Sequence, residues 1–558
     1  MRSGRGARRR EAALVAFDIS TERDDAGAGT TVPAPGPRAR WPTRVADRWR
    51  AASRHQRRLT AGVAAGVAVV LVGGVVAGAA VASHRHDEQL RAAPGGVLSL
   101  DGELAEMWRV EAEGGVHAVL AGGAVVLVDG RDAVAREVAS GAERWRVTLG
   151  AGVRCGPAPR WESSVEWVLP SDLVTCVHGD DDGRSVTVLD GSGDVVGQRA
   201  LPAAGYGGED VEVAPAADGG LLVVEHDTGM PAVLDHATVA EAEDAVAGIV
   251  TGRASVRVED AVSGELRFEV PTREHSAENL EVCIVPWDLS AGWSTSFDPA
   301  TPVRLEVMGG TEVVASPTVV GYRWCGVGGA STTDGVAPGG SRDDVGTSTV
   351  PYPGGGWLAP ADDGPGRVLL AEDGSVRLVA ARGTVLTDPT AVLDGGDPAV
   401  LATKGNAVVR LDAGGEELWR ADVRESQLLA HVGDVVVVVT DEELVAVDAL
   451  DGGERWRVRF FDGQTSRVAW ATSAVTDGER VTVALRTYPV GDDGEAAGEL
   501  LTADLASGAV TWTSLGPTAT PFVAAVGGHV VLQHELGWED WDGGDEPSVT
   551  SVSILAPR

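Results

Sequence analysis

Lysine is almost absent from this chain: of 46 basic residues only Lys404 is a lysine, and the rest are arginines. Aromatic side chains are also scarce at 5%, with six phenylalanines and four tyrosines against sixteen tryptophans. The use of Arg in place of Lys, together with the excess of Ala, Val and Gly, indicates a GC-rich, actinobacterial coding bias. Such a bias describes the genome and says nothing about the fold.

Positive charge is confined largely to the N-terminal region. Residues 1–58 hold 14 arginines and 6 acidic residues, whereas residues 83–558 hold 32 basic and 76 acidic residues, a net charge of −44. A body of that charge repels nucleic acid and anionic lipid head groups, so we predict no nucleic-acid partner. Residues 1–58 are rich in Arg, Pro and Gly with little periodicity, and we expect a disordered basic tail.

One long uncharged run follows this tail. Residues 61–82, "AGVAAGVAVVLVGGVVAGAAVA", are 22 residues long, enough to cross the ~30 Å hydrocarbon core as a helix. Arginines precede the run and acidic residues follow it, so the positive-inside rule predicts a single-pass plasma-membrane protein with a cytoplasmic N-terminus. We place the transmembrane helix at 59–83. A buried core helix and a cleaved signal peptide, with "AVAS" at 80–83 as the cleavage site, are the alternatives.

Cysteine is rare, and all four cysteines lie beyond the apolar run. An even number of cysteines in an oxidising compartment indicates two disulfides. Of the three possible connectivities we favour the local one, Cys155 with Cys176 and Cys283 with Cys325. No Cys/His cluster has the spacing of a zinc site.

Windows of helical period are also scarce in the body. From about Pro94 the chain consists of short Val-rich and Leu-rich runs separated by Gly and Asp, the pattern of many short strands joined by tight turns. The stretch "GAERWRV" at 141–147 nearly returns as "GGERWRV" at 452–458. Each copy ends a unit of two apolar strands, a turn with Gly and a third strand with an aromatic residue.

The aromatic residues mark the repeat. Trp108 and Trp145 are 37 residues apart, as are Trp419 and Trp456. A period near 40 residues with about four strands per unit predicts the blades of a β-propeller. In degenerate copies Leu201 or Phe268 is expected to replace the tryptophan. The residues that we assign to the repeat as packing residues are Trp108, Trp145, Phe268, Trp419, Trp456 and Trp512.

The repeat resembles that of the pyrroloquinoline-quinone-like (PQQ-like) β-propeller family. The resemblance is carried by "VDALDGGERW" at 447–456, "LDAGGEELW" at 411–419, "VASGAERW" at 138–145 and "ADLASGAVTW" at 503–512. It covers roughly residues 100–556, strongly at both ends and weakly between about 270 and 385. It implies that the aromatic residue lies on the outer strand of each blade and packs against the neighbouring blade.

The two ends of the body favour a closed ring. "LAEMWRVEAEGG" at 104–115 has a tryptophan strand with no preceding hairpin, and the C-terminal "SVTSVSILAP" has no tryptophan strand after it. We therefore predict that the N-terminal strand is the outer strand of the final blade. The predicted fold is all-β: a propeller of about eight four-stranded blades at 100–558, with seven or nine as alternatives, after a juxtamembrane linker at 84–99.

Motifs that carry defined chemistry are lacking. The family includes quinone enzymes with calcium sites, but no adjacent cysteine pair or convincing catalytic set is present, so we expect neither cofactor nor metal. The acidic stretches "HGDDDGRS" at 178–185 and "EDWDGGDEP" at 539–547 are expected for so acidic a body. No GxSxG, HExxH or GxxxxGK[ST] motif occurs. Insertions at 326–356 and 537–547 are candidate functional loops.

These features favour a non-catalytic binding or scaffolding module at the cell envelope, whose partners are envelope proteins or cell-wall components. Within the family the chain is more similar to the non-catalytic lipoprotein of an outer-membrane assembly complex than to the dehydrogenases, although it lacks a lipobox cysteine. Fold analogy alone does not establish function. The alternatives are an extracytoplasmic quinoprotein oxidoreductase and a ligand sensor coupled to the cytoplasmic tail.

Overall fold

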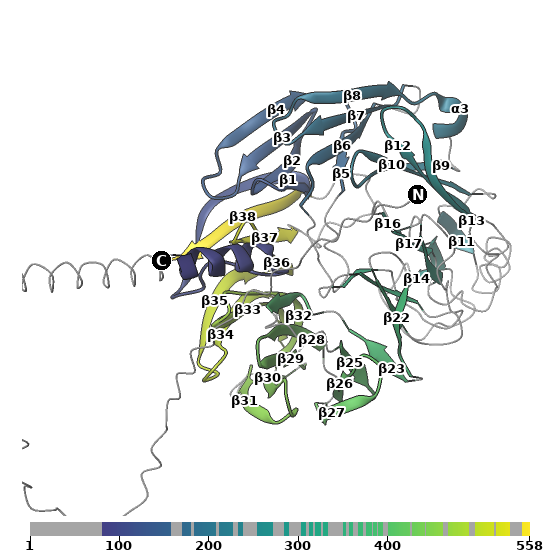
Figure 1. The fold of residues 1–558 in the computed structure, drawn as a ribbon. Coiled ribbons are helices and arrows are strands. Elements are labelled where there is room, and N and C mark those ends of the chain that lie inside the picture. Colours follow the sequence, from purple (N-terminus) through teal and green to yellow (C-terminus); the bar gives the residue numbers. More distant parts are fainter. Residues whose placement is uncertain are drawn as a thin grey trace, which may run out of the picture. The chain divides into compact units, whose positions relative to one another are not determined.

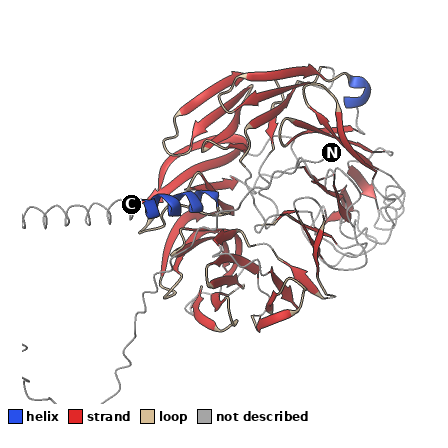
Figure 2. Ribbon diagram, viewed as in Figure 1, coloured by secondary structure: helices blue, strands red, loops and turns tan. Residues whose placement is uncertain are grey.

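The computed structural model describes residues 81–558 except for several segments, the longest of which are 158–169, 238–253, 272–283, 289–302, 333–349 and 536–548. In the described part nearly all regular structure is β-strand (Figure 2). The described helices include none that is long and apolar enough to cross a membrane. The predicted tail at 1–58 and most of the predicted membrane helix lie outside the described residues.

Most of the strands form antiparallel sheets that follow one another along the chain, and the four-stranded sheets are the blades (Figure 1). The first blade contains part of β1 (Leu104–Leu120), β2 (Ala124–Asp129), β3 (Asp132–Glu137) and β4 (Glu143–Thr148). The second contains β5 (Arg154–Gly156), β6 (Leu173–His178), β7 (Ser185–Asp190) and β8 (Val195–Ala200). After the short helix α3 (Ala203–Tyr206), the third contains β9 (Val211–Ala216), β10 (Gly220–His226), β12 (Ala254–Asp260) and β13 (Leu266–Pro271).

Two three-stranded sheets follow in the middle of the chain. They contain β11 (Val233–Ala237), β15 (Val303–Val307) and β14 (Ile284–Asp288), and β16 (Glu312–Ala315), β17 (Val319–Trp324) and β18 (Val327–Thr332). The next two blades contain β19 (Val350–Pro351), β20 (Trp357–Pro360), β21 (Arg367–Leu370) and β22 (Val376–Val379), and β23 (Thr384–Leu386), β25 (Val400–Lys404), β26 (Val408–Leu411) and β27 (Glu417–Ala421).

Three blades complete the chain. Blade β28–β31 contains β28 (Gln427–Val432), β29 (Val435–Val439), β30 (Glu443–Asp448) and β31 (Glu454–Arg459), with β24 (Ala391–Leu393) parallel to β28. Blade β32–β35 contains β32 (Arg467–Thr476), β33 (Arg480–Pro489), β34 (Ala497–Asp504) and β35 (Val510–Pro517). The closing blade contains β36 (Thr520–Val526), β37 (His529–Glu535), β38 (Val549–Pro557) and the start of β1.

The closing blade joins the two ends of the described chain. Strand β1 pairs with β38 from Leu104 to Glu113 and with β2 from Glu113 to Leu120, so one strand serves two blades. The prediction that the N-terminal strand is the outer strand of the final blade is confirmed. When β1 is counted in both of its blades, the described residues form eight four-stranded units in a propeller-like series. The two three-stranded sheets are additional to these eight.

Burial explains why these segments are strands. All five residues of β29, Val435–Val439, are buried because both faces of an inner strand meet neighbouring blades. In the outer strand β31 only Trp456 is fully buried, and charged residues alternate with it. The apolar clusters accordingly lie between blades, as where β28–β31 meets β32–β35.

Four tryptophans of the repeat connect one blade to the next. Each of these four lies on an outer strand over a positive-φ glycine in the turn of the following blade, where a Cβ atom would approach the indole to below 3 Å. Only glycine permits both the backbone conformation and the close contact. The indole N–H also donates to a carbonyl in that turn, at 2.8 to 3.2 Å. The pairs are Trp108 with Gly141, Trp145 with Gly193, Trp419 with Gly452, and Trp456 with Gly508.

The near-repeat "GAERWRV" therefore contributes to two successive joints, with its glycine in one and its tryptophan in the next. Gly141 receives Trp108 from the closing blade, and Trp145, four residues later, packs on Gly193 of the second blade. A bulge one residue before the tryptophan, between the pairs of Ala135 and Arg136, sets its direction.

The second blade departs from the pattern, and the expectation that Leu201 replaces its aromatic residue was wrong. Gly197 occupies the tryptophan position, four residues after the turn glycine, and the side chain of Val262 fills the space above it. Arg199 then donates from Nε to the Ala261 carbonyl at 3.0 Å, in the way the indoles do elsewhere. Leu201 instead follows β8 and is buried between the second and third blades.

Trp512 also departs from the predicted packing. Strand β35 lacks the bulge next to its tryptophan, so Trp512 pairs with Leu501 and faces back toward blade β28–β31. A one-residue change of register moves a side chain to the opposite face. Trp512 is 39% exposed and meets Phe460 edge to face at 6.3 Å. No turn glycine is available ahead of it, because β38 and β1 come from opposite ends of the chain.

The remaining predicted residues fall into two groups. Cys155 and Cys176 form the expected disulfide, which links opposite residues of β5 and β6. Cys283 and Cys325 lie outside the described residues. Phe268 pairs through its backbone with Val258 on β12, at the position predicted for the repeat. The insertion 537–547 and most of 326–356 also lie outside the described residues.

The segment expected to be a linker, 84–99, packs against the propeller. Residues 81–92 are helical, and residues 94–101, which we call the strap, follow. Strap backbone groups bond to Thr476, Val392 and Gly528 at 2.8 to 2.9 Å, and the Leu100 amide donates to the Asp477 carboxylate at 2.8 Å. Leu90, Val97 and Leu100 are buried, at 1% exposure or less.

Candidate binding pocket beside the strap

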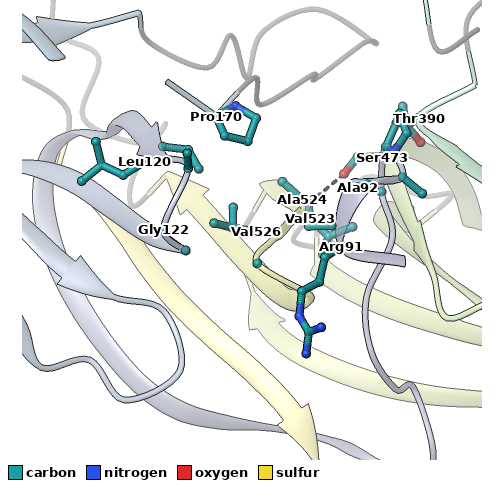
Figure 3. A pocket seen from close by; sticks show the side chains of 18 of the residues that line it. Arg91, Ala92, Leu120, Gly122, Pro170, Thr390, Ser473, Val523, Ala524 and Val526 are labelled. Carbon is teal, nitrogen blue, oxygen red and sulfur yellow. Dashed lines mark hydrogen bonds between the residues drawn. The ribbon is translucent and has the colours of Figure 1, made fainter. Parts of the chain in front are cut away.

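A cavity of about 460 Å³ lies where the strap passes the inner strands of the last and first blades (Figure 3). Its walls come from the end of the helix at 81–92, the turn between β1 and β2, and β32 and β36. Small residues dominate the wall. The residues that define it are Arg91, Ala92, Pro94, Gly95, Leu120, Gly122, Pro170, Thr390, Ser473, Val523, Ala524 and Val526.

The two hydroxyl groups in the wall already serve the fold. Thr390 donates to the Leu429 carbonyl at 3.1 Å and accepts from the Ala474 amide at 2.8 Å. Ser473 accepts from the Val523 amide at 2.7 Å, which ties β32 to β36. These hydroxyls hold blades together and are not arranged as nucleophiles beside a base.

Arg91 is the one charged side chain among the described lining residues. In Figure 3 its guanidinium group points away from Pro170 and Leu120, so mainly its aliphatic part faces the cavity. Its charge, after burial, lowers the pKa of His529 at the turn between β36 and β37. The described wall thus offers apolar contact and one cation at its edge, and it contains no carboxylate or histidine for proton transfer.

A second polar cluster lies at the joint of the second and third blades. Glu259 is buried and accepts bonds from Arg257 at 2.9 Å, Arg199 at 2.9 Å and the Tyr206 hydroxyl at 2.7 Å. Both guanidinium groups flank the Tyr206 ring, at 5.3 and 5.7 Å from its centre. Burial raises the pKa of Glu259, but these bonds outweigh it and hold the pKa below its usual value. Both carboxylate oxygens accept hydrogen bonds, so this cluster secures a joint that lacks a tryptophan.

The predicted repeat residues are not brought together in the pocket. Each of Trp108, Trp145, Trp419 and Trp456 serves a different joint, and the Cys155–Cys176 disulfide belongs to the second blade. Sequence reasoning missed the pocket because β32 and β36, which form much of its wall, lie hundreds of residues from the strap in the chain. The "PGG" at 94–96 is the available signal, since a Cβ on Gly96 would meet the Leu90 carbonyl oxygen at 2.0 Å.

The acidic stretches form no recognisable ion site where they can be described. No three His, Cys, Asp or Glu side chains gather into a possible metal site among the described residues. Residues 180–182 and 539–547, which hold most of the acids singled out in the sequence, lie outside the described part.

Comparison with known proteins bears on the repeat. Residues 404–536 match the family described as "Outer membrane protein assembly factor BamB". The match spans blades β28–β31 and β32–β35, so the predicted PQQ-like repeat is confirmed for this region. No characterised protein matches the sequence significantly.

Solved structures give distant matches. BamB from Moraxella catarrhalis is 12% identical, with 81% of this chain and 100% of that chain covered and a TM-score of 0.34. The quinohemoprotein alcohol dehydrogenase ADHIIG from Pseudomonas putida HK5 is 12% identical, with 85% and 81% covered and a TM-score of 0.36. The WD40 domain of SCAP from fission yeast is 9% identical, with 81% and 97% covered and a TM-score of 0.29.

Proposed function

We propose that the chain is a membrane-anchored, non-catalytic binding or scaffolding module whose propeller lies outside the cytoplasmic membrane. The observation that carries the proposal is the pocket beside the strap. Its described wall is mostly small and apolar, and its hydroxyl groups are committed to joints between blades. Such a cavity suits the binding of an apolar group of a partner better than acid–base chemistry. The PQQ-like repeat of residues 404–536 agrees with a binding role.

The proposed location rests on charge and on the disulfide. The arginines before residue 59 and the acidic body after residue 83 favour a cytoplasmic tail and an external propeller. The Cys155–Cys176 disulfide suits an oxidising compartment. The plasma membrane, reached through the helix proposed at 59–83, and envelope proteins or cell-wall components are the proposed partners.

Protease protection tests the location. With intact spheroplasts, we expect proteinase K to digest the propeller while an epitope within residues 1–58 survives until the membrane is permeabilised. The helix at 81–92 should be cut only slowly at its C-terminal end, because Leu90 is buried. Protection of the propeller in intact spheroplasts would show that the topology is reversed.

Site-specific crosslinking tests the binding role. A photoreactive residue at Ala92, in the pocket wall, is expected to capture a defined envelope component in living cells. The same residue at Val379, which is 60% exposed on the outer strand β22, is the matched control. Equal capture patterns at both positions, or none at Ala92, would contradict the proposal that this pocket binds a partner.

A further inference from the structure

The joint between blade β32–β35 and the closing blade, which we call the closing seam, is not filled by the tryptophan that the repeat predicts for it. The tryptophan that would fill it, Trp512, faces the preceding blade. Polar groups take its place. The hydroxyls of Thr482 and Thr502 bond to each other at 2.8 Å on the seam face of blade β32–β35, and both are buried.

His534 faces this seam from β37. It lies on the same face of the strand as Leu532, which packs against Ala484 and Leu500 of blade β32–β35. His534 is 7% exposed and lies directly opposite Ser551 of β38, which is fully buried. Side chains paired in this way have Cβ atoms about 4.5 to 5.5 Å apart.

Neither side chain has a described hydrogen-bond partner at the buried atom. The Nδ1 atom of His534 and the Oγ atom of Ser551 are both buried and unpaired. Unpaired buried polar groups are rare in native structures and each calls for an explanation. The two groups lie side by side on β37 and β38, on the face of the closing blade that meets blade β32–β35.

The charged neighbours of His534 among the described residues are of both signs. Strand β1 presents Glu106, Arg109 and Glu111 to the seam face, and β33 presents Arg486. The described residues of β36 that pack against blade β32–β35 bring no charge. Burial and then Arg109 lower the pKa of His534, while Glu106 opposes them.

We propose that the closing seam is proton-sensitive: it is tight while His534 is neutral and loosens when the imidazole takes up a proton. A buried imidazolium beside Arg109 loses hydration and gains repulsion, and both costs disappear when the seam opens. The His pKa in the open state is ordinary, near 6.5, and the closed-state pKa lies below it. Closure is therefore favoured above pH 6.5 and is lost as the pH falls toward the closed-state pKa.

The strap confines the loosening to one part of the seam. It crosses from Thr476 and Asp477 of blade β32–β35 to Gly528 of the closing blade, at the opposite end of β37 from His534. The part around His534 and Ser551 can thus open while the strap stays bound. In an envelope whose exterior is acidified, this opening would change the surface that a partner meets.

Hydrogen exchange on the purified full-length protein tests the proposal. After correction for intrinsic rates, the amides of β37 and β38 are expected to exchange about threefold faster or more at pH 5.5 than at pH 7.5. The amides of β28–β31 should show a smaller change. The variant His534→Gln, which keeps a polar group but cannot gain a proton, should abolish the extra change at β37 and β38.

Two variants separate His534 from two other histidines whose pKa is lowered. His178 on β6 also has a lowered pKa, and His529 lies on the same strand as His534 but beside Arg91. His178→Gln and His529→Gln should leave the pH response of the seam in place. If His529→Gln rather than His534→Gln removed it, or if β37 and β38 responded no more than β28–β31, the proposal would be overturned.

Discussion

At the scale of single residues, the tryptophans illustrate how one residue type serves two structural roles. Trp456 is 8% exposed, lies on Gly508 and donates to the Leu505 carbonyl at 2.8 Å. Trp512 occupies the equivalent place in the sequence but faces the preceding blade, has no turn glycine over its ring and is 39% exposed. The motif alone therefore does not determine burial; the next blade must supply the receiving glycine.

Replacing these tryptophans should have unequal effects on stability. Trp456→Ala removes a buried indole and its hydrogen bond and is expected to lower the free energy of unfolding by ~3 to 5 kcal/mol. Trp512→Ala, the matched control, should cost about half as much or less, since much of its surface already contacts water. Urea unfolding followed by tryptophan fluorescence measures both. Equal losses would mean that the exposed face of Trp512 is covered in solution.

The receiving glycine can be tested separately. Gly508 has a φ of +71°, and a Cβ there would meet the Trp456 ring at 2.8 Å. We expect Gly508→Ala to destabilise through both strain and displacement of the indole, by ~1 to 3 kcal/mol. Gly433→Ala is the control, because its φ is +57° but nothing lies within 4 Å of the added atom. A Gly508→Ala loss no larger than that of the control would argue against the close contact.

Asp260 allows a prediction about pH. Its carboxylate accepts bonds from the Ser263 amide and from Arg267, which lower its pKa to about 2 from an ordinary 3.8. A lowered folded-state pKa contributes stability that is present above pH 3.8 and is lost as the pH falls toward 2. Asp260→Asn can keep the turn but does not titrate. The unfolding midpoint should therefore fall less from pH 5 to pH 2.5 in the variant than in the parent protein. An equal fall in the two proteins would count against this assignment.

At the scale of elements, the strap is part of the fold, although most of it lies in the segment that was expected to be a linker. Leu100 is fully buried and its amide bonds to Asp477, and Arg480 pairs with Asp101 at 2.6 Å. Leu100→Ala is expected to lower stability by ~2 to 5 kcal/mol. Gln89→Ala, an exposed change in the preceding helix, should be close to neutral. Differential scanning calorimetry compares the two, and a neutral Leu100→Ala would show that the strap is not bound in solution.

Sequence patterns predicted the strand-rich texture, the blade period and the joining of the chain ends, because strands, turns and packed tryptophans are local. They failed where a neighbour decides the outcome. Gly197 stands where an aromatic residue is expected. Val262, in the turn between β12 and β13, fills the space above it, and Arg199 of the same strand makes the hydrogen bond to the turn carbonyl. The pocket was missed for the same reason, since its wall joins Arg91 to Ser473 and Val523.

At the scale of the whole molecule, closure depends on the last ten residues. Strand β38 lies between β37 and β1, and its Val552 and Ile554 are fully buried against the first blade. Without it, β37 and β1 would each expose an unpaired edge, and the first and last blades would lose their common sheet. Closing a chain through its two ends should therefore make unfolding of these blades cooperative.

Deleting residues 549–558 tests this dependence. We expect the truncated protein to lose protection from hydrogen exchange in β36, β37 and the first half of β1, and to aggregate through the exposed edges. Deleting only Arg558, which is exposed and bonds through its amide to the Glu103 carbonyl at 3.0 Å, is the control and should change little. If the longer deletion left exchange in β1 and β37 unchanged, closure through β38 would not be what holds the two ends together. Because β1 also pairs with β2, the loss should stop near Glu113, where β1 passes into the first blade.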